Sequence, residues 1–474
     1  MIKFDFDLEA HEYKKVHFVG IGGVSMSGLA GLLHSKGYIV SGSDRTEGDY
    51  IPHLRKLGID VTIGQTKDNI KDQDLFIYTD AIKLDNEELK AAIETGKPCV
   101  NRGVFLGALM KNYKNSIAVS GMHGKSTTTA MITKILLSSS VDPTILIGGE
   151  FNELDGNFRV GNSEYFTTEA CEYKGNILHY YPQTAIILNI DVEHVDYYRD
   201  IDHIVETFSR YVENIPEEGT AILNIDDENV EKLLDSGKCN KITYGIENEN
   251  ADYNITNIQF DDIGYSKFDL VTPEQTVSFN LNVIGKFNIY NAAAAIIATY
   301  ENGIDIETIQ NAIKEYKTLH RRLEVVGQYN GATIIDDYGH HPIEIKSTLE
   351  ALKEHTQGKL ICVFQPHTYS RTKNLLDEYS EAFFNADKVA ITKIFPARET
   401  EATIHATELV DRLKKNNVDV SYEESFDEAS DFIIKNAQKG DTVLVTSCGD
   451  INRMTELLFK KVINEANGKH EKLS

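Results

Sequence analysis

The segment that most constrains the fold of this chain is residues 116–129, Ser-Ile-Ala-Val-Ser-Gly-Met-His-Gly-Lys-Ser-Thr-Thr-Thr. An apolar strand runs into a glycine-rich turn and then into a helix-forming run. Such a turn directs backbone N–H groups inward at a helix N-terminus, where they suit a polyphosphate. Lys125 would neutralise the outer phosphates, and the Ser126 hydroxyl would ligate Mg²⁺. Val119 stands where the full P-loop has its first glycine, so a plain strand–turn–helix is the alternative.

The formal net charge of −25 argues against a surface for DNA, RNA or anionic lipid, because phosphate binding needs clustered Lys and Arg. The five cysteines show no metal-ligand spacing, and an odd, sparse set fits a reducing compartment. We find no apolar signal segment and no apolar run of membrane length. We therefore expect a cytoplasmic protein that binds small molecules and neither nucleic acid nor membrane.

Apolar runs alternate with helical patterns in three successive α/β units, which indicates parallel sheets covered on both faces. Residues 251–284 instead alternate as antiparallel strands do. The predicted fold is a Rossmann-like domain over residues 1–110, a P-loop ATPase-like domain with an added antiparallel sheet over 111–319, and a Rossmann-like domain over 320–474. The predicted strands are 16–19, 39–41, 75–78, 117 onward, 144–147, 165–168, 185–189, 360–364, 388–392 and 442–446, and predicted helices include 344–353, 375–384 and 429–436.

A second glycine-rich turn, Gly20-Ile-Gly22-Gly23-Val-Ser25-Met-Ser27-Gly28, follows the first predicted strand. At a helix N-terminus it would hold a diphosphate, and an acid such as Asp44, after the next strand, often meets a ribose. Ser25 replaces the third glycine of the dinucleotide pattern G-x-G-x-x-G. A nucleotide site and structural packing both remain open for this turn.

Two further strand ends in the P-loop unit carry metal-binding residue types. Glu169 ends a predicted strand, where a carboxylate is well placed to meet Mg²⁺ near the phosphates; a helix cap or surface acid is the alternative. His194 follows the next apolar strand, and a neutral imidazole can bind Mg²⁺ or Mn²⁺. A lone histidine is more often structural, so both interpretations stay open.

The third unit begins with Asp336-Asp337-Tyr338-Gly339-His340-His341-Pro342, a dense group of titrating and hydrogen-bonding side chains. Adjacent histidine side chains diverge, so we favour hydrogen bonding to a substrate over a metal site. Phe364-Gln-Pro-His367-Thr-Tyr369-Ser-Arg371 leaves the next strand. Arg371 would grip a carboxylate with two hydrogen bonds, or else pair with a nearby acid such as Asp377.

Taken together, and in this order, these segments resemble the Mur ligase family over nearly the whole chain. The resemblance implies a UDP-sugar domain, a central ATPase and a C-terminal amino-acid domain. It implies that L-alanine is joined to the carboxylate of UDP-N-acetylmuramate through an acyl phosphate, with ATP converted to ADP and phosphate, in peptidoglycan synthesis. ATP and Mg²⁺ are the implied cofactors, with Mn²⁺ able to substitute, and the implied state is a monomer or weak homodimer.

Carried over position by position, the resemblance also implies roles for individual side chains. The UDP-sugar would be held by Gly20, Gly22, Gly23, Ser25, Ser27 and Asp44. ATP would be held by Gly121, His123, Gly124, Lys125, Ser126, Thr127, Asn288, Asn291, Arg322 and Asp337. The metal ligands would be Ser126, Glu169 and His194, and the amino acid would meet His341, His367 and Arg371. Lys125, His194, His341 and Arg371 would be the catalytic residues.

Some positions depart from the family pattern, and other functions stay open. Ser126 replaces the commoner Thr, while Phe287 and Gln65 each stand where the alanine-adding member often has His. No Lys lies between Lys174 and Lys232, which favours the alanine-adding type because later-acting relatives carry a carbamylated Lys there. The alternatives are a relative that attaches an intact tripeptide to UDP-N-acetylmuramate, a nicotinamide-dependent dehydrogenase and a non-catalytic nucleotide-binding regulator.

Overall fold

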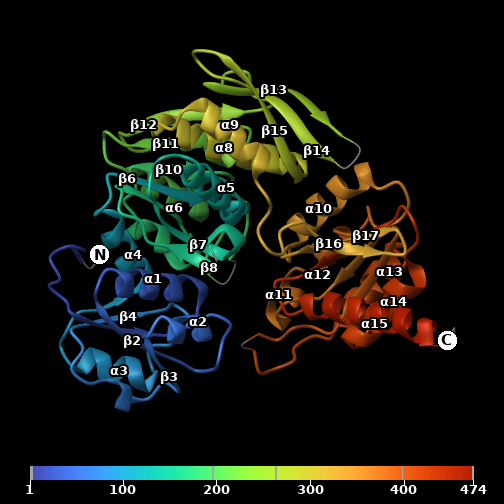
Figure 1. The fold of residues 1–474 in the computed structure, drawn as a ribbon, viewed down its shortest axis with the longest axis horizontal. Helices are drawn as coiled ribbons and strands as arrows, with labels where there is room; N and C mark the ends of the chain where they lie inside the picture. Colours follow the sequence, from blue (N-terminus) through green and yellow to red (C-terminus); the bar gives the residue numbers. More distant parts are fainter. Residues whose placement is uncertain (1–3, 155, 195–196, 262–263, 398, 472–474) are drawn as a thin grey trace. The chain divides into compact units, whose positions relative to one another are not determined.

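The computed structural model describes residues 4–154, 156–194, 197–261, 264–397 and 399–471, with side chains to residue 462. Its strands form three sheets of five, ten and six strands, connected mainly through helices (Figure 1). The predicted α/β fold class, with Rossmann-like first and last regions and a P-loop ATPase-like central region that carries added strands, is confirmed.

The first sheet is parallel throughout and has the strand order β3-β2-β1-β4-β5. Because β1 lies between β2 and β4, the strand order reverses beside the Gly20 turn, which is where ligands bind to open α/β sheets. The elements are β1 (Lys15–Val19), α1 (Val24–Ser35), β2 (Ile39–Asp44), α2 (Ile51–Lys56), β3 (Asp60–Ile63), η1 (Lys67–Asn69), β4 (Leu75–Tyr78), α3 (Glu87–Glu94), β5 (Cys99–Asn101) and α4 (Arg102–Met110).

The central sheet has the order β15-β14-β13-β12-β11-β10-β6-β9-β7-β8. The P-loop strand β6 lies between β10 and β9, parallel to both. The elements are β6 (Asn115–Ser120), α5 (Lys125–Ser138), β7 (Thr144–Phe151), η2 (Asn152–Leu154), β8 (Gly156–Arg159), β9 (Tyr165–Glu169), η3 (Tyr173–His179), β10 (Thr184–Ile187), α6 (Ile201–Glu213), β11 (Thr220–Asn224), α7 (Glu228–Glu231), β12 (Asn240–Gly245), β13 (Tyr253–Phe260), β14 (Tyr265–Val271), β15 (Thr276–Ile284), α8 (Lys286–Glu301) and α9 (Ile306–Glu315).

The strands predicted as an added antiparallel sheet, β13, β14 and β15, extend this same central sheet at one edge. Strand β13 pairs in parallel with β12, with Tyr244 opposite Tyr253 and Gly245 opposite Asn254. The alternation within β15, where every second side chain is buried as far as Val283, gives the expected half-buried pattern. The alternation in the sequence indicates that one face of these strands is buried, but it does not indicate which strands pair with one another.

The third sheet has the order β16-β17-β21-β18-β19-β20, with only β16 antiparallel to its neighbour among the described pairs. Ile361 and Val363 pack in one apolar cluster and Cys362 and Phe364 in another. Because successive strand residues face opposite sides, both faces of this sheet are buried. The elements are β16 (Glu324–Tyr329), β17 (Ala332–Asp337), α10 (Pro342–His355), β18 (Leu360–Phe364), α11 (Tyr369–Asn374), α12 (Leu376–Glu381), β19 (Lys388–Thr392), α13 (Ala406–Lys415), β20 (Val420–Glu423), α14 (Phe426–Asn436), β21 (Thr442–Thr446) and α15 (Asn452–Glu471).

The chain divides into two compact units. The first comprises Met1–Ile258, Lys267–Leu281 and Phe287–Tyr316, and the second comprises Gln259–Ser266, Asn282–Lys286 and Lys317–Ser474. The first predicted domain and most of the second share the first unit, because helix α1 packs against β7 and β8 of the central sheet. A Cβ on Gly31 of α1 would stand 2.2 Å from the Phe158 ring of β8. The three domain boundaries stay predictions.

Several elements end at other residues than predicted, and two of these differences bear on the site. Strand β10 stops at Ile187, and Asn189 beyond it bonds His123 of the P-loop turn. The helix predicted over 375–384 is the shorter α12, which ends at Glu381, and a separate short helix, α11, precedes it, with Leu375 between them at φ −109° and ψ 25°. The pattern of apolar residues indicates buried segments but not the residue at which a strand or helix ends, so it gave neither of these ends.

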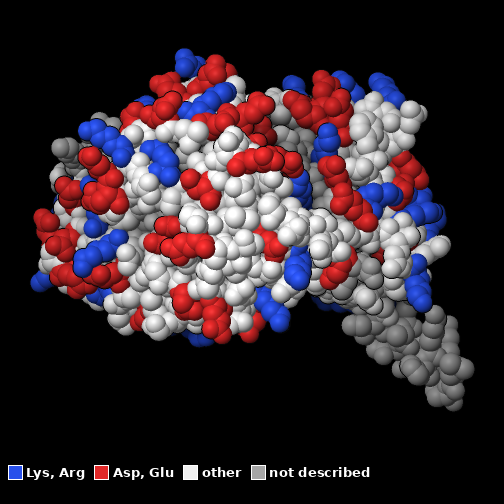
Figure 2. Space-filling model, turned by 90° about the horizontal axis from the view of Figure 1, so that it is seen from above, with Lys and Arg blue, Asp and Glu red and all other residues white. Residues whose placement is uncertain are grey.

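No helix among the described residues is long and apolar enough to span a membrane. On the face shown in Figure 2, described Lys and Arg side chains are interspersed with Asp and Glu. The excess of acidic residues is therefore distributed over that face together with basic ones.

Candidate functional site

The P-loop turn lies between β6 and α5, at the carboxyl end of its strand. Gly121 and Gly124 have φ values of +129° and +84°, and a Cβ on Gly124 would stand 2.4 Å from Asn291 Oδ1. Glycine alone combines that backbone conformation with such close packing. The turn therefore holds its N–H groups at the start of α5, as a phosphate site requires.

Asn189 stabilises this turn from the segment that follows the neighbouring strand β10. Its Oδ1 accepts the His123 N–H at 2.8 Å, and its Nδ2 donates to the His123 carbonyl at 3.1 Å. The Met122 N–H donates to the Asn189 carbonyl at 3.3 Å. The sequence analysis assigned Asn189 to a strand and missed this role, which depends on β10 lying beside β6.

Lys125 is held by a buried acid that the sequence analysis did not assign to the site. Its Nζ lies 3.2 Å from Glu172 Oε2, with side chains 16% and 1% exposed. Nζ also donates to the Met122 carbonyl at 3.0 Å. Burial, the largest single effect, would lower the pKa of Lys125, but the nearby acids, with Glu172 foremost, together outweigh it and the pKa is raised. The lysine is therefore a buried, permanently charged ammonium.

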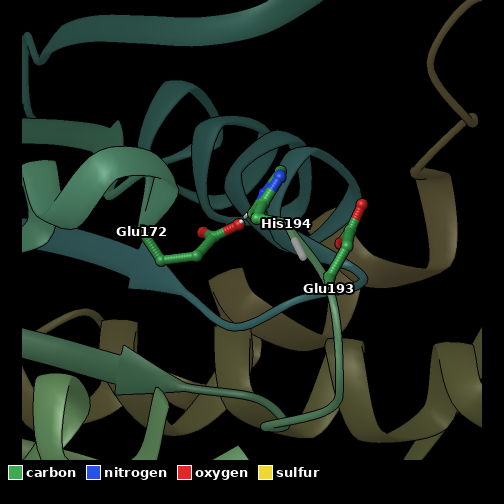
Figure 3. Close-up of side chains that lie close together, drawn as sticks. All are labelled: Glu172, Glu193 and His194. Carbon is green, nitrogen blue, oxygen red and sulfur yellow. Dashed lines mark hydrogen bonds and ion pairs between the residues drawn. The ribbon is translucent and has the colours of Figure 1, made fainter. Parts of the chain in front are cut away.

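Glu172 also contacts His194. Its Oε1 lies 2.9 Å from His194 Nε2, and Figure 3 shows the carboxylate directed toward the imidazole. Burial would raise the pKa of Glu172, yet Lys125 and the hydrogen bond from His194 lower it to about 2. The acid is therefore ionised near neutral pH and links the P-loop lysine to the histidine.

The predicted metal ligands Ser126, Glu169 and His194 occupy three different elements or loops. Ser126 lies in the first turn of α5, and Glu169 ends β9, where its Oε1 accepts the Gly148 N–H at 2.8 Å. Among the described residues, His194 is grouped instead with Glu172 and Glu193, whose ligand atoms lie within 4.8 Å of one another (Figure 3). The site is thus richer in carboxylates than the sequence analysis expected.

The two asparagines predicted to hold ATP lie side by side on α8. Asn291 Nδ2 donates to Asn288 Oδ1 at 2.9 Å, and both side chains are buried. The approach of Asn291 to Gly124 places this pair against the P-loop. Phe287, beside them on the chain, is 36% exposed.

The Gly20 turn is held by the end of β2. The N–H groups of Gly20 and Ile21 donate to the Ser43 carbonyl at 2.8 and 2.9 Å, and the Gly22 N–H donates to Asp44 Oδ2 at 2.9 Å. Asp44 therefore shapes the turn itself.

Two serines follow in α1. The Ser27 hydroxyl is buried and donates to the Val24 carbonyl at 2.8 Å. The Ser25 hydroxyl accepts from Arg102 Nη1 at 3.3 Å. The structure thus adds a cation, Arg102, at the mouth of this turn.

In the second unit, Asp337 ends β17 and its carboxylate accepts two backbone N–H groups, from Leu323 at 3.0 Å and Gly339 at 2.9 Å. Burial raises the pKa of Asp337, and Arg322 opposes that rise. The Arg322 guanidinium lies 5.0 Å from the centre of the Tyr338 ring. Arg321, by contrast, donates to the Gly449 carbonyl at 2.9 Å and forms an ion pair with Asp336. These contacts indicate a structural role for Arg321.

The predicted amino-acid residues lie at the carboxyl ends of β17 and β18 in the same unit. Arg371 Nη1 lies 3.3 Å from His367 Nδ1, and the His367 ring lies 6.1 Å from that of His340. Burial lowers the pKa of His340 to about 3 and of His367 to about 4, and the nearby Arg371 charge adds to both effects. His341, at the N-cap of α10, is 5% exposed.

The alternative partner for Arg371, Asp377, is bonded to Arg412 instead. His340 had no assigned role in the sequence analysis, because nothing in an adjacent histidine pair indicates which ring faces a neighbouring strand end. The structure brings His340, His367 and Arg371 together as one cluster.

Comparison with known proteins adds to this geometry. Three family models match in succession: "Mur ligase family, catalytic domain" at residues 15–114, "Mur ligase middle domain" at 119–299, and "Mur ligase, glutamate ligase domain" at 321–449. The UDP-N-acetylmuramate–L-alanine ligase of Clostridium tetani is 44% identical over 94% of this chain and 98% of its own length. That of Acetivibrio thermocellus is 43% identical over 96% and 97%.

Solved structures agree in fold. The UDP-N-acetylmuramate–alanine ligase of Thermotoga maritima superposes with a TM-score of 0.79 at 26% identity, covering 95% of this chain and 99% of that one. A murein peptide ligase from Psychrobacter arcticus gives a TM-score of 0.70 at 23% identity, covering 94% and 98%, and at that identity it supports the fold alone.

Proposed function

Because the chain belongs to the Mur ligase family, we propose that it joins L-alanine to the carboxylate of UDP-N-acetylmuramate, with cleavage of ATP to ADP and phosphate. The observation that carries this proposal is the 44% identity to an alanine-adding ligase across nearly both whole chains. The reaction is a step of peptidoglycan synthesis.

In the first step, a carboxylate oxygen of the muramic acid attacks the γ-phosphorus of ATP, and the bond to the β,γ-bridging oxygen breaks. An acyl phosphate and ADP result. The N–H groups of the P-loop turn and the Lys125 ammonium face the phosphates and offset the charge that spreads over the transferred group. The buried ion pair with Glu172 holds Lys125 at the turn before ATP arrives.

In the second step, the amine of L-alanine attacks the activated carbonyl, a proton leaves the nitrogen, and phosphate departs. We assign the alanine carboxylate to Arg371, because a guanidinium binds a carboxylate with two parallel hydrogen bonds. An effective base for this proton has a pKa near neutral pH, whereas burial lowers the pKa of His340 to about 3 and of His367 to about 4, which makes both weak bases. His341 stays a candidate for this base.

The residues present fit a divalent cation. The donors are the Ser126 hydroxyl, the Glu169 carboxylate and the His194 imidazole, with Glu172 and Glu193 close to the histidine. Oxygen donors suit Mg²⁺, and an added imidazole also suits Mn²⁺. A bound ion would supply positive charge to the phosphate oxygens; we propose Mg²⁺.

The remaining roles are part of the same proposal. The UDP diphosphate is assigned to the Gly20 turn through Gly23 and Ser25, because the Gly22 N–H is already donated to Asp44. Adenine is assigned to Asn288 and Asn291. Arg322 and Asp337 are assigned to phosphate and ribose. We place the protein in the cytoplasm, as a monomer or weak homodimer.

The test is release of phosphate with UDP-N-acetylmuramate, L-alanine, ATP and Mg²⁺, omitting one component at a time. We expect release only when all four are present, and chelation of the metal should abolish it. Turnover with an intact tripeptide but not with alanine would identify the recycling relative. ATP binding without phosphate release would indicate a regulator, and oxidation of a reduced nicotinamide cofactor would indicate a dehydrogenase.

A further inference from the structure

Beneath the Gly20 turn lies a buried polar network that the proposed reaction does not use. His17 Nε2 lies 2.8 Å from Glu88 Oε1, with side chains 3% and 0% exposed. The Ser43 hydroxyl donates to Glu88 Oε2 at 2.6 Å, and His17 Nδ1 lies 2.8 Å from Ser41 Oγ. Both oxygens of a fully buried carboxylate are thus bonded, which such a group requires.

This network reaches the turn through one residue. Ser43, whose hydroxyl binds Glu88, also uses its carbonyl to accept the N–H groups of Gly20 and Ile21 at 2.8 and 2.9 Å. Asp44, next on the chain, accepts the Gly22 N–H. Three consecutive N–H groups of the turn are therefore fixed by the end of β2, and the position of that end depends on Glu88. The N–H groups at the start of α1 stay available to an anion, as at any helix start.

We propose that Glu88 is a positioning residue for UDP-N-acetylmuramate, acting through Ser43 to fix the turn that receives the diphosphate. This inference rests on the proposed function of that turn. Glu88 does not touch the nucleotide. His17, which pairs with Ser41 in the β1–β2 register, occupies the second oxygen of Glu88 and so orients the first toward Ser43.

A purely structural role explains this arrangement less well. A buried charged group is weak evidence for stability, because well-packed apolar side chains of similar size often stabilise a protein as much or more. A network with every member bonded instead specifies one geometry. That geometry is imposed here on the backbone of a ligand-binding turn.

The first test is Glu88→Gln, which keeps the size of the side chain but replaces one acceptor oxygen by a donor. We expect KM for UDP-N-acetylmuramate to rise about tenfold, since small displacements of a binding group are costly. The turnover number and KM for ATP should change less than about twofold. Glu87→Gln, at the exposed neighbour on α3, is the matched control and should change nothing. A fall in turnover number with unchanged KM would point to lost folded protein and overturn the proposal.

The second test is Ser43→Ala, alone and combined with Glu88→Gln. If Glu88 acts through Ser43, their effects on KM should not add, and the double variant should resemble the stronger single one. Additive effects would overturn the proposal. Should Glu88→Gln fail to fold, Ser43→Ala decides alone: a raised KM supports the proposal, and an unchanged KM overturns it.

Direct binding of UDP-N-acetylmuramate, measured by calorimetry without ATP or alanine, separates this inference from the proposed function. If the wild-type protein binds no UDP-N-acetylmuramate, the proposed function fails. If wild type and Glu88→Gln bind it equally well, only the role of Glu88 fails. The expected result is tight binding by wild type and about tenfold weaker binding by the variant.

Discussion

The P-loop site of the first unit and the histidine cluster of the second each place a cation beside the carboxyl ends of parallel strands, but they balance its charge differently. Lys125 is paired with the buried carboxylate of Glu172. Arg371 contacts the neutral imidazole of His367, and no carboxylate in the described part of the chain lies within ion-pair distance of it. One cation is compensated by the protein, whereas the other is left for a ligand.

This difference matches the two ligands proposed. A phosphate that binds Lys125 shares the ammonium with the Glu172 carboxylate. The charge of Lys125 is therefore already balanced before a phosphate binds. A carboxylate that reaches Arg371 displaces no acid. The charge balance of the second cluster therefore depends on its substrate, while that of the P-loop site does not.

The largest effect is expected from Lys125→Ala. Loss of the ammonium should lower the rate of ADP formation by about 10³-fold, as when a group that stabilises the transferring phosphoryl is removed. Phosphate release and ADP formation are measured with all substrates present. Lys114→Ala, at an exposed lysine, serves as the control. Circular dichroism should show the fold retained, since Glu172 keeps its bond to His194; normal turnover of the variant would contradict the role of Lys125.

The next largest effect is expected when the carboxylate that balances the charge of Lys125 is removed. Glu172→Gln leaves the Lys125 ammonium buried without its partner, and should lower the free energy of unfolding by about 3 kcal/mol at pH 7. Because the pKa of Glu172 is lowered from 4.5 to about 2 by folding, its stabilising contribution is complete above about pH 4.5 and is lost as the pH falls toward 2.

The measurement is urea unfolding of both proteins in metal-free buffer over a range of pH. The difference in free energy of unfolding between wild type and Glu172→Gln should become smaller as the pH drops below about 4.5. Glu213→Gln, at an exposed position on α6, should have the same free energy of unfolding as wild type. If Glu172→Gln is as stable as wild type at pH 7, Glu172 does not balance the charge of Lys125, and the two sites do not differ in this respect.

Arg371→Ala probes the uncompensated cation. Loss of its charged hydrogen bonds to the alanine carboxylate should raise KM for L-alanine about 50–100-fold, with KM for ATP unchanged. Arg412→Ala, which removes a partly exposed guanidinium paired with Asp377, is the control. Equal KM values for alanine in wild type and Arg371→Ala would assign the carboxylate elsewhere.

The sequence predicted those parts of the fold and site that depend on local pattern. Strands 75–78, 360–364, 388–392 and 442–446 agree with the observed bounds, because continuous apolar runs between helices identify buried parallel strands. The two glycine-rich turns were located because their chemistry lies in consecutive residues. The resemblance then supplied the order of domains.

What the sequence did not predict depends on contacts between distant segments. Glu172 had no assigned role in the sequence analysis, because only the fold brings it to Lys125, 47 positions away. Glu88 meets Ser43 across 45 positions, and Asn189 meets His123 across 66. The pairing of β13 with β12 was missed for the same reason. Periodicity identifies a buried face but not its partner.

The smallest predicted effect concerns the neutral histidines around Arg371. Burial lowers the pKa of His340 to about 3, despite the opposing attraction of Glu344. Below about pH 6.5 the unfolded chain binds a proton at His340 that the folded chain does not, so wild-type stability falls as the pH falls from 6.5 toward 3. His340→Gln removes this contribution. Between pH 7.5 and 5.5, wild type should therefore lose about 1 kcal/mol more free energy of unfolding than the variant.

Urea unfolding at the two pH values measures this difference, and His405→Gln, at an exposed histidine, should retain the wild-type pH dependence. If His340→Gln loses as much stability as wild type on acidification, His340 is charged in the folded protein. Arg371 would then lie beside a second cation, and the site would need an acid of its own, as the P-loop has in Glu172. The expected result leaves Arg371 as the single charge of the three-residue cluster, ready for the carboxylate of the amino acid.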